Sequence, residues 1–553
     1  MSGIHSTHNS FAFIQARLGS TRFPKKILKQ IPEGSDSTFL DHIHRRLKTV
    51  FDSNQIVFLI PESDIESIQY LKTKGYLYFC GSELDVRDRF RKAAKHFGAK
   101  HIFRLTADNP FIDIDSIRYL YEAILEIAEK YYSLSMEGLP LGMGVECFSA
   151  DSLFYHSEET ELERHKEHVS LHIKEFPEIH RQYRLSPPHL QSVDAFQQLS
   201  KNEISKLRIT VDEWKDYELI CEIWKTLGDK NANFGAEEVL QLYQNNPHMF
   251  SLNASVEQIV FELPKNEKTK KQVNILYGKP DEYGYGHFER CKSLSIYLQL
   301  YGYDVKLTSS FDNSEINVPH IFDIRENEFS VRNSFFIDNV NHPPNNTNAC
   351  YFLPHPSYPI LNTTLEKASF TKLSYYSSPI SEVDRGLGTS PGKLLVYAGQ
   401  LDETQSEQID NFLLQFHQSK MNSQTTIFQS ILRIGGTKPK DNNIQFVQRI
   451  PYTEFLKEME FSEWIFTYFG QTMMECVAKG KKVCLFGISE IHETLGKFAE
   501  KELNIPYVGT LTELSNLRHF PKKTIPKKIK YVRDAHIQIL NWLNSINSAI
   551  YEN

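Results

Sequence analysis

The chain has 553 residues, of which 40% are apolar and 24% charged, and its net charge is −7. This composition is typical of globular proteins, and at roughly 100–200 residues per domain the length predicts two to four domains. The acidic balance argues against sequence-independent nucleic-acid binding, which needs a basic face. No run approaches ~18 consecutive apolar residues, so we expect no membrane span.

The seven cysteines are odd in number and widely spaced, and no two of them form a Cys-x-x-Cys pair. This pattern predicts reduced thiols in a cytoplasmic protein, with neither a zinc site nor a disulfide framework. The polar N-terminus lacks the apolar segment of a secretory signal. A homodimer stays an open alternative for the assembly.

Short apolar runs alternate with amphipathic stretches in the first part of the chain. We expect strands at 11–14, 56–60, 76–79 and 101–105, with helices between them. One helix follows position 39, where Ser37 or Thr38 is a candidate cap. A further strand is expected at 207–211. Such alternation predicts an α/β fold with a mostly parallel, doubly wound sheet.

A second α/β pattern follows a Lys-rich segment at 265–271. It begins with an apolar run at 273–276, continues into a helix through 288–298, and restarts with another strand at 394–397. We therefore predict four regions, although a solvated loop inside one domain is an alternative reading of the Lys-rich segment. They are a first domain at 1–252, a linker at 253–272, and two lobes at 273–390 and 391–553.

The loop after the first predicted strand concentrates cationic and small side chains. It carries Arg17, Gly19, Ser20, Arg22 and Lys26. Ligands of doubly wound sheets bind at the carboxyl ends of strands, where this loop lies. Arginine and lysine at such a place suit a polyphosphate. An ordinary basic surface loop is the alternative.

Two aspartates also follow predicted strands. Asp108 stands just beyond the strand at 101–105, and Asp212 directly follows the strand at 207–211. Carboxylates at strand ends can share a Mg²⁺ ion with substrate phosphates. A turn or a helix cap would account for each aspartate equally well.

These segments, taken together and in order, resemble a known family. The stretches IQARLGSTRFPKK at 14–26, GSELDVRDR at 81–89 and RLTADNP at 104–110 are similar to motifs of the spore-coat polysaccharide cytidylyltransferases. These are relatives of the CMP-sugar synthetases for ketodeoxyoctonate and sialic acid. The resemblance spans about 11–252 and continues through LRITVD at 207–212. The family usually has glycine where this chain has Lys25.

The resemblance implies cytidylyl transfer from CTP to a hydroxyl of an acidic sugar. It makes Arg22 and Lys26 catalytic candidates and assigns Mg²⁺ to Asp108 and Asp212. It implies in-line attack on the α-phosphorus, with catalysis by positioning and charge neutralisation. The implied substrate- and nucleotide-binding residues are Arg17, Gly19, Ser20, Ser82, Asp85 and Glu146.

The second half carries two Gly-containing loops of its own. Gly284, Gly286 and His287 stand between a predicted strand and a helix, where a diphosphate or a developing anion is favoured and a histidine can take a proton. Gly470 and Thr472 precede Glu475, at a turn into another helix. A histidine bonded to its own loop and a structural glutamate are the alternatives.

Together these loops resemble the nucleotide-sugar hydrolase of pseudaminic acid biosynthesis, which is similar to two-lobed glycosyltransferases of the MurG type. The resemblance covers about 273–510. It implies that His287 activates water for attack on the anomeric carbon of a UDP-linked sugar, and that Gly470, Thr472 and Glu475 bind the nucleotide. The expectation is a bifunctional enzyme, with a glycosyltransferase or a non-catalytic binding module as alternatives for the second half.

Overall fold

A computed structural model of the chain describes residues 9–20, 22–256, 270–280, 285–311, 317–324, 333–337, 348–351, 370–372, 388–399, 401–417, 428–516, 520 and 534–551. The chain divides into two compact units. The first comprises residues 1–270 with 299–302, and the second comprises 271–298 with 303–553. The boundaries expected at 252, 273 and 391 stay predictions, and most of the expected linker lies outside the described residues.

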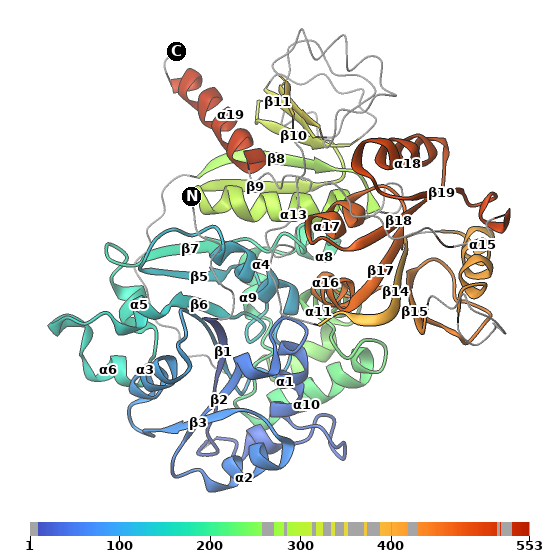
Figure 1. Ribbon diagram of the computed structural model, residues 1–553. Helices are drawn as coiled ribbons and strands as arrows, with labels where there is room; N and C mark the ends of the chain where they lie inside the picture. Colours follow the sequence, from blue (N-terminus) through green and yellow to red (C-terminus); the bar gives the residue numbers. More distant parts are fainter. Residues whose placement is uncertain are drawn as a thin grey trace. The chain divides into compact units, whose positions relative to one another are not determined.

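The first unit contains a seven-stranded mixed sheet in the order β3-β2-β1-β4-β6-β5-β7 (Figure 1). Strand β6 runs antiparallel to β4 and β5, whereas the other pairings are parallel. The strands are β1 (Ser10–Gln15), β2 (Ile56–Pro61), β3 (Tyr78–Gly81), β4 (His101–Thr106), β5 (Tyr132–Met136), β6 (Glu146–Ser149) and β7 (Arg181–Leu185). The predicted α/β class with a doubly wound, mostly parallel sheet is confirmed.

Helices cover both faces of this sheet because its strands alternate apolar side chains between the two faces. On one face Phe13 packs with Phe90 of α3 (Val86–Phe97) in a buried apolar cluster. On the other, Phe58 stacks against His44 of α1 (Phe39–Leu47). Thr38 caps α1 together with Asp41, which selects one of the two predicted caps.

The strand expected at 207–211 does not form. Arg208 makes only an isolated bridge to Leu141, after which the chain turns away. Beside that bridge Gly142 has a φ of 93°, and a Cβ there would lie 2.5 Å from the Thr210 amide nitrogen. A glycine is therefore required for this close approach, which brings the segment before Asp212 to the sheet.

The second unit contains two parallel six-stranded sheets, β13-β12-β11-β10-β8-β9 and β16-β15-β14-β17-β18-β19. The first has β8 (Lys271–Tyr277), β9 (Tyr303–Thr308), β10 (His320–Asp323), β11 (Ser334–Ile337), β12 (Asn348–Tyr351) and β13 (Phe370–Lys372). The second has β14 (Ser390–Gly399), β15 (Ser430–Gly435), β16 (Ile444–Val447), β17 (Ser462–Thr467), β18 (Lys482–Gly487) and β19 (Tyr507–Thr510). Two parallel sheets match the predicted two α/β lobes.

The helices of the second unit connect these strands in the manner of parallel α/β folds. They include α13 (Tyr285–Leu300), α15 (Glu403–Leu414), α16 (Tyr452–Phe461), α17 (Gln471–Ala478), α18 (Glu490–Leu503) and α19 (Asp534–Tyr551). Helix α19 returns to the first of the two sheets, where Trp542 packs on Phe335 with ring centroids 5.2 Å apart.

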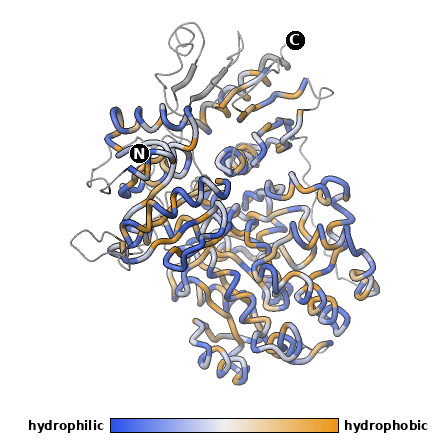
Figure 2. Tube along the Cα trace, turned by 90° about the vertical axis from the view of Figure 1, so that its right-hand side faces the viewer, coloured by the Kyte–Doolittle hydropathy of each residue, from blue (hydrophilic) through white to orange (hydrophobic). Residues whose placement is uncertain are grey.

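Figure 2 shows hydrophobic and hydrophilic residues interspersed along the helices. Among the helices that the structure describes, none is both long enough and apolar enough for a membrane crossing. Six cysteines are described as free thiols, and five of them are buried.

Candidate functional site

The ammonium group of Lys26 gathers both predicted metal aspartates at one point in the first unit. Its Nζ lies 3.2 Å from Asp108 Oδ2 and 3.1 Å from Asp212 Oδ1, and it donates to the Val211 carbonyl at 2.7 Å. Three segments far apart in sequence thus converge at the carboxyl end of the sheet. The Lys26 side chain is only 10% exposed, so these contacts are well shielded from water.

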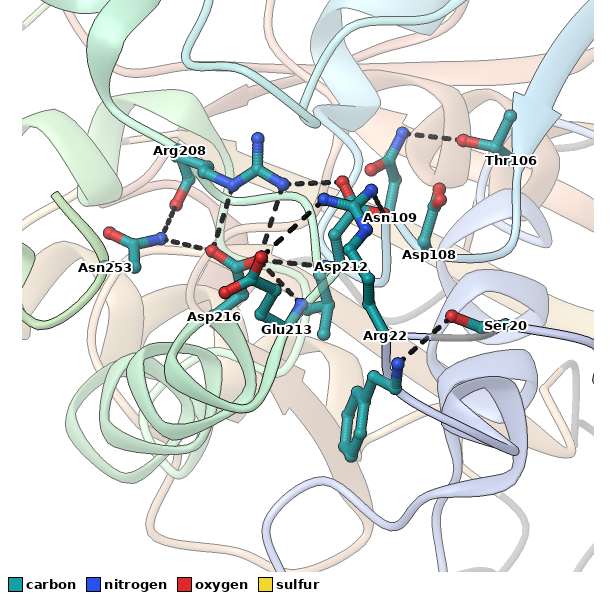
Figure 3. Close-up of polar contacts among 12 residues, drawn as sticks. Ser20, Arg22, Thr106, Asp108, Asn109, Arg208, Asp212, Glu213, Asp216 and Asn253 are labelled. Carbon is teal, nitrogen blue, oxygen red and sulfur yellow. Dashed lines mark hydrogen bonds and ion pairs between the residues drawn. The ribbon is translucent and has the colours of Figure 1, made fainter. Parts of the chain in front are cut away.

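Cationic side chains keep Asp212 ionised. Burial works to raise its pKa, but the charges of Lys26, Arg208 and Arg22 outweigh burial and hold the pKa below its ordinary value. Arg22 reaches Asp212 at 3.5 Å and Glu213 at 3.8 Å, and its side chain stays half exposed. Figure 3 shows Arg22 and Arg208 beside Asp212, with Asp108 on the neighbouring segment.

The carboxylates of Asp108 and Asp212 fit a divalent cation of the magnesium type. Asp108 Oδ1 is buried and has no hydrogen-bond partner, which leaves an acceptor of high charge unsatisfied. Mg²⁺ is commonly held by one or two carboxylates, with waters and substrate phosphates completing its octahedron. Within the described residues no cluster of three or more His, Cys, Asp or Glu side chains could hold a metal, so a two-carboxylate site is what the chain offers.

The loop after β1 borders an open cavity of about 380 Å³. Arg17 and Gly19 line this cavity together with Ser63, Asp64 and Glu66 at the start of α2 (Ile65–Lys74). The Arg17 and Gly19 side of the cavity is exposed. Glu83 completes a lining in which Arg17 faces three carboxylates, so the cationic character lies on the loop side of the cavity.

Two other residues of this loop shape its backbone. The Ser20 hydroxyl accepts a hydrogen bond from the Phe23 amide at 3.3 Å. Lys25 has a φ of 57°, in the left-handed region that favours glycine. This conformation explains why a glycine suits position 25, and it turns the chain so that the next side chain, Lys26, enters the site.

Ser82 and Asp85 shape the start of α3. The Ser82 hydroxyl accepts from the Asp85 amide at 3.0 Å, and the Asp85 carboxylate caps α3 by accepting from Asp88 at 2.7 Å. Both predicted binding residues therefore have structural partners. Their position after β3, at the carboxyl edge of the sheet, keeps them on the ligand side.

Glu146 is held in an ion-pair network. Its carboxylate contacts Arg104 at 3.4 Å, Lys174 at 2.8 Å and the Ser170 hydroxyl at 2.6 Å. Burial opposes its ionisation, but Lys174 and Arg104 lower the pKa of Glu146 to about 2. The predicted sugar contact stays a prediction, and the charge of this carboxylate is already balanced.

In the second unit His287 lies against a buried carboxylate. Its Nδ1 is 2.7 Å from Oδ1 of Asp323, at the end of the adjacent strand β10. Arg290 Nη2 donates to the same oxygen at 2.5 Å and lies 2.9 Å from His287 Nδ1. An ionised carboxylate only accepts, so a hydrogen bond at this distance places the proton on Nδ1, and Arg290 is its neighbour because both groups donate to one oxygen. The tautomer so fixed has its basic nitrogen at Nε2.

Asp323 carries no exposed surface and is ionised. Burial would raise its pKa, but the charge of Arg290 and the hydrogen bonds from Arg290 and His287 hold the pKa well below the ordinary value. Arg290 contacts both carboxylate oxygens, and the Cys291 thiol donates to Oδ2 at 3.3 Å. Three side chains of α13 and the carboxylate at the end of β10 thus form one compact group.

The other predicted residues of the second half lie at the β17–α17 turn. Gly470 precedes the first residue of α17, and Thr472 lies in its first turn. Glu475 is buried and accepts from Gln471 Nε2 at 3.0 Å and from the Tyr452 hydroxyl. Gly286, in the first turn of α13, approaches this turn, since a Cβ added there would lie 3.2 Å from Gln471 Cβ. Gly284 lies outside the described residues.

Sequence reasoning missed the partners of these groups. Asp323 follows an apolar run, which is a usable signal once a strand is expected there. Arg208, Asp216 and Asn253 surround Asp212, as Figure 3 shows. No local pattern marks Asn253, which stands 45 residues from the backbone oxygen of Arg208 that it contacts.

A family model and several known proteins match part of the chain. Residues 11–256 match the family described as cytidylyltransferase. The spore coat polysaccharide biosynthesis protein SpsF of Bacillus subtilis is 32% identical over 42% of this chain and 93% of its own length. A protein of Methanocaldococcus jannaschii, MJ1063, is 29% identical over 44% of this chain and 94% of its own.

Among solved structures, a cytidylyltransferase from Leptospira borgpetersenii is 24% identical, with a TM-score of 0.38, and the match covers 46% of this chain and 99% of that one. The family match and both protein relatives agree on the first unit, where Lys26, Asp108 and Asp212 converge. The chain therefore belongs to the cytidylyltransferase family, through its residues 11–256.

Proposed function

We propose that the first unit transfers a cytidylyl group from CTP to a hydroxyl of an acidic sugar, with Mg²⁺, in the synthesis of a surface polysaccharide. The observation that carries this proposal is that the carboxylates of Asp108 and Asp212 both contact the ammonium group of Lys26. Two carboxylates and a lysine at a strand edge provide a cation site and a phosphate contact together.

In this reaction the sugar oxygen attacks the α-phosphorus of CTP, the bond to the β-phosphate breaks, and pyrophosphate leaves. Arg17 and Arg22 are exposed enough to bind phosphate oxygens as forks. Lys26 holds the aspartates in register and neutralises charge on the transferring group. The chain's own contribution is positioning and electrostatic stabilisation.

Asp108 and Asp212 would hold the cation, and Asp108 Oδ1 is the oxygen that lacks another partner. When bound, Mg²⁺ supplies neutralisation of the phosphate charge that develops in such transfers. The proposed nucleotide position is the cavity beside Arg17 and Gly19.

The experiment is a pyrophosphate-release assay with CTP and Mg²⁺ across a panel of eight- and nine-carbon acidic sugars. We expect release that depends on one sugar and falls at least ~10²-fold in Asp108→Ala, the scale of losing one electrostatic partner. Sugar-dependent release that is undiminished in Asp108→Ala would remove that residue from the site. Silence across the panel would overturn the substrate class.

For the second unit we propose hydrolysis of a UDP-linked sugar. The observation in favour is the group of His287, Asp323 and Arg290, which fixes a basic Nε2 at the start of α13. His287 would take a proton from water, the water oxygen would bond to the anomeric carbon, and UDP would leave with the electron pair of the broken C–O bond. Gly470, Thr472 and Glu475 are the proposed nucleotide contacts.

Product analysis distinguishes this reaction from its alternatives. Free sugar and UDP indicate hydrolysis, whereas sugar linked to an acceptor indicates a glycosyltransferase. UDP-sugar binding measured by calorimetry without turnover, unchanged by His287→Ala, indicates a binding module. Either of the last two results would overturn the proposed hydrolysis.

A further inference from the structure

A buried polar network lies directly behind Asp212. Arg208 Nη2 donates to Asp212 Oδ2 at 2.6 Å, and Arg208 Nε donates to Asp216 Oδ1 at 3.0 Å. Asn253 Nδ2 reaches Asp216 Oδ1 at 2.8 Å and the Arg208 carbonyl at 2.9 Å. Asp216 has no exposed surface, and Arg208 and Asn253 are 6% and 3% exposed. Figure 3 shows these side chains in contact with one another on one side of Asp212.

This network holds both the main chain and the carboxylate of Asp212. Asp216 Oδ2 accepts the backbone amides of Asp212 at 2.9 Å and of Glu213 at 3.1 Å, which holds the main chain. Arg208 takes the Oδ2 oxygen of Asp212 at 2.6 Å. The other oxygen, Oδ1, points to Lys26 and Arg22, on the side of Asp108. Arg208 therefore sets the orientation of the Asp212 carboxylate, with Oδ2 bound to Arg208 and Oδ1 directed to Lys26.

Helix capping alone does not account for the arrangement. Asp216 is the third residue of α10 (Trp214–Ile223) and belongs to its capping box, as Asp41 does in α1. A cap needs the backbone amides, but not a guanidinium that bridges two carboxylates. Asp41 caps α1 with two tyrosine hydroxyls and a lysine as its side-chain neighbours, none of them in the proposed site. Asp41 is therefore a matched control for Asp216, because both belong to capping boxes and only Asp216 lies beside the proposed site.

We propose that Arg208, Asp216 and Asn253 are positioning residues, which hold Asp212 so that Oδ1 faces the cation shared with Asp108. The proposal rests on the metal role proposed above for Asp108 and Asp212. It extends the functional set to Asn253, in a 3₁₀ helix at Pro247–Asn253 near the end of the first unit. Hydrogen bonds to ligating carboxylates commonly set metal affinity, and their loss costs about 10–100-fold.

The test is Mn²⁺ binding to the full chain, followed by the electron paramagnetic resonance signal of free Mn²⁺ without nucleotide. We expect Asp216→Asn to weaken binding by about 10–100-fold and Asp41→Asn to leave the affinity within about 2-fold. Thermal unfolding of both variants shows how much each loses as a cap. Equal Mn²⁺ affinity in the two variants would overturn the proposal.

Arg208→Gln separates positioning from simple electrostatics. Removal of a positive charge beside Asp212 would strengthen Mn²⁺ binding if only charge mattered, whereas loss of positioning weakens it. We expect weaker binding. Asn253→Ala, which keeps every charge, is the milder second variant, and we expect a loss of about 3–10-fold, at or below the lower end of the range for such contacts. Tighter binding in Arg208→Gln together with unchanged binding in Asn253→Ala would contradict the proposal.

The variant Asp108→Ala distinguishes failure of the proposed metal site from failure of the proposed positioning role. If it binds Mn²⁺ like the wild type, the proposed metal site is wrong. If it loses Mn²⁺ while Asp216→Asn and Asn253→Ala retain it, the metal site stands and only the positioning role is wrong.

Discussion

The two units carry different charged groups at the carboxyl ends of their sheets. In the first, Asp108 and Asp212 come from two separate segments, and both contact the ammonium group of Lys26 on a third. In the second, Asp323 ends strand β10, whereas His287 and Arg290 lie one helical turn apart on α13. Both groups lie where parallel strands end, as expected for open α/β sheets.

The difference lies in what the charges are arranged to receive. The first group pairs one buried cation with two carboxylates and leaves Asp108 Oδ1 unsatisfied, which suits a metal and phosphates. The second balances its one carboxylate internally with Arg290 and orients an imidazole, which suits proton transfer. Two groups of different charge can thus lie at the ends of parallel strands in one chain. Variants of one group should leave the other unaffected.

The largest expected effect is that of Lys26→Ala. It removes the group that binds both aspartates and leaves two carboxylates without their shared cation. We expect cytidylyl transfer to fall by about 10²–10³-fold, measured as pyrophosphate release. Lys29→Ala, which changes a neighbouring lysine outside these contacts, is the control. A Lys26→Ala enzyme with more than a tenth of wild-type turnover would break the first half of the comparison.

His287→Ala should abolish only the second activity. A positioned general base contributes about 10²–10⁴-fold, so UDP release from a UDP-linked sugar should fall at least ~10²-fold. Asp323→Asn should lower it too, because the Nδ1 proton then loses its charged acceptor. Steady-state UDP release is the measurement, with pyrophosphate release from CTP as the internal control. Parallel loss of both activities would argue against two separate sites.

The first unit should be the more sensitive to mild acid. Burial lowers the pKa of His42, His44 and His180 to about 4 and that of His172 to about 3. Unfolded histidine binds a proton near pH 6.5, so stability is full above that pH and is lost as pH falls toward 4. Each histidine then costs about 1.4 kcal/mol per pH unit.

Hydrogen exchange followed by mass spectrometry at pH 7.5 and 5.5 checks this expectation peptide by peptide. The four histidines with these lowered pKa values all lie in the first unit. Peptides of β2 and α1 should lose protection first. Loss confined to peptides of the second unit would reverse the expectation.

Glu146→Gln should have the smallest effect. With a pKa of about 2 in the folded chain, Glu146 contributes stability that is present above about pH 4.5 and is lost as pH falls toward 2. The neutral variant should unfold with a free energy lower by about 1–3 kcal/mol at pH 7 and a shallower acid dependence. Urea unfolding at pH 7 and pH 3.5 measures both quantities. Unchanged stability with a raised KM for the sugar would instead support its predicted binding role.

The sequence alone was sufficient for the α/β class and for the main strands of the first sheet, because buried parallel strands leave apolar runs. It was not sufficient at 207–211, where an apolar run becomes an isolated bridge beside Gly142. That outcome depends on a close backbone approach that no local pattern records.

Sequence reasoning also found some residues of the candidate site and missed others. Position after a strand selected Asp108 and His287, and family resemblance selected Lys26 among several cations. Asn253 could not be selected, since it contacts Arg208 and Asp216 from 45 and 37 residues away. The apolar run before Asp323 indicates a strand end, but not the contact with His287 across 36 residues. Asp216 is near Asp212 in sequence, but an acid at the third position of a helix is typical of an ordinary cap. Ser82 and Asp85, which the resemblance selected as binding residues, make local contacts at the start of α3, and their binding role stays a prediction.

The most direct test of the account is the formation of a CMP-linked sugar from α-labelled CTP by wild-type, Asp108→Ala and His287→Ala proteins, side by side. We predict full label transfer with the wild type and with His287→Ala, and at least ~10²-fold less with Asp108→Ala. Label transfer that survives Asp108→Ala, or that disappears in His287→Ala, would contradict the assignment of cytidylyl transfer to the first unit alone.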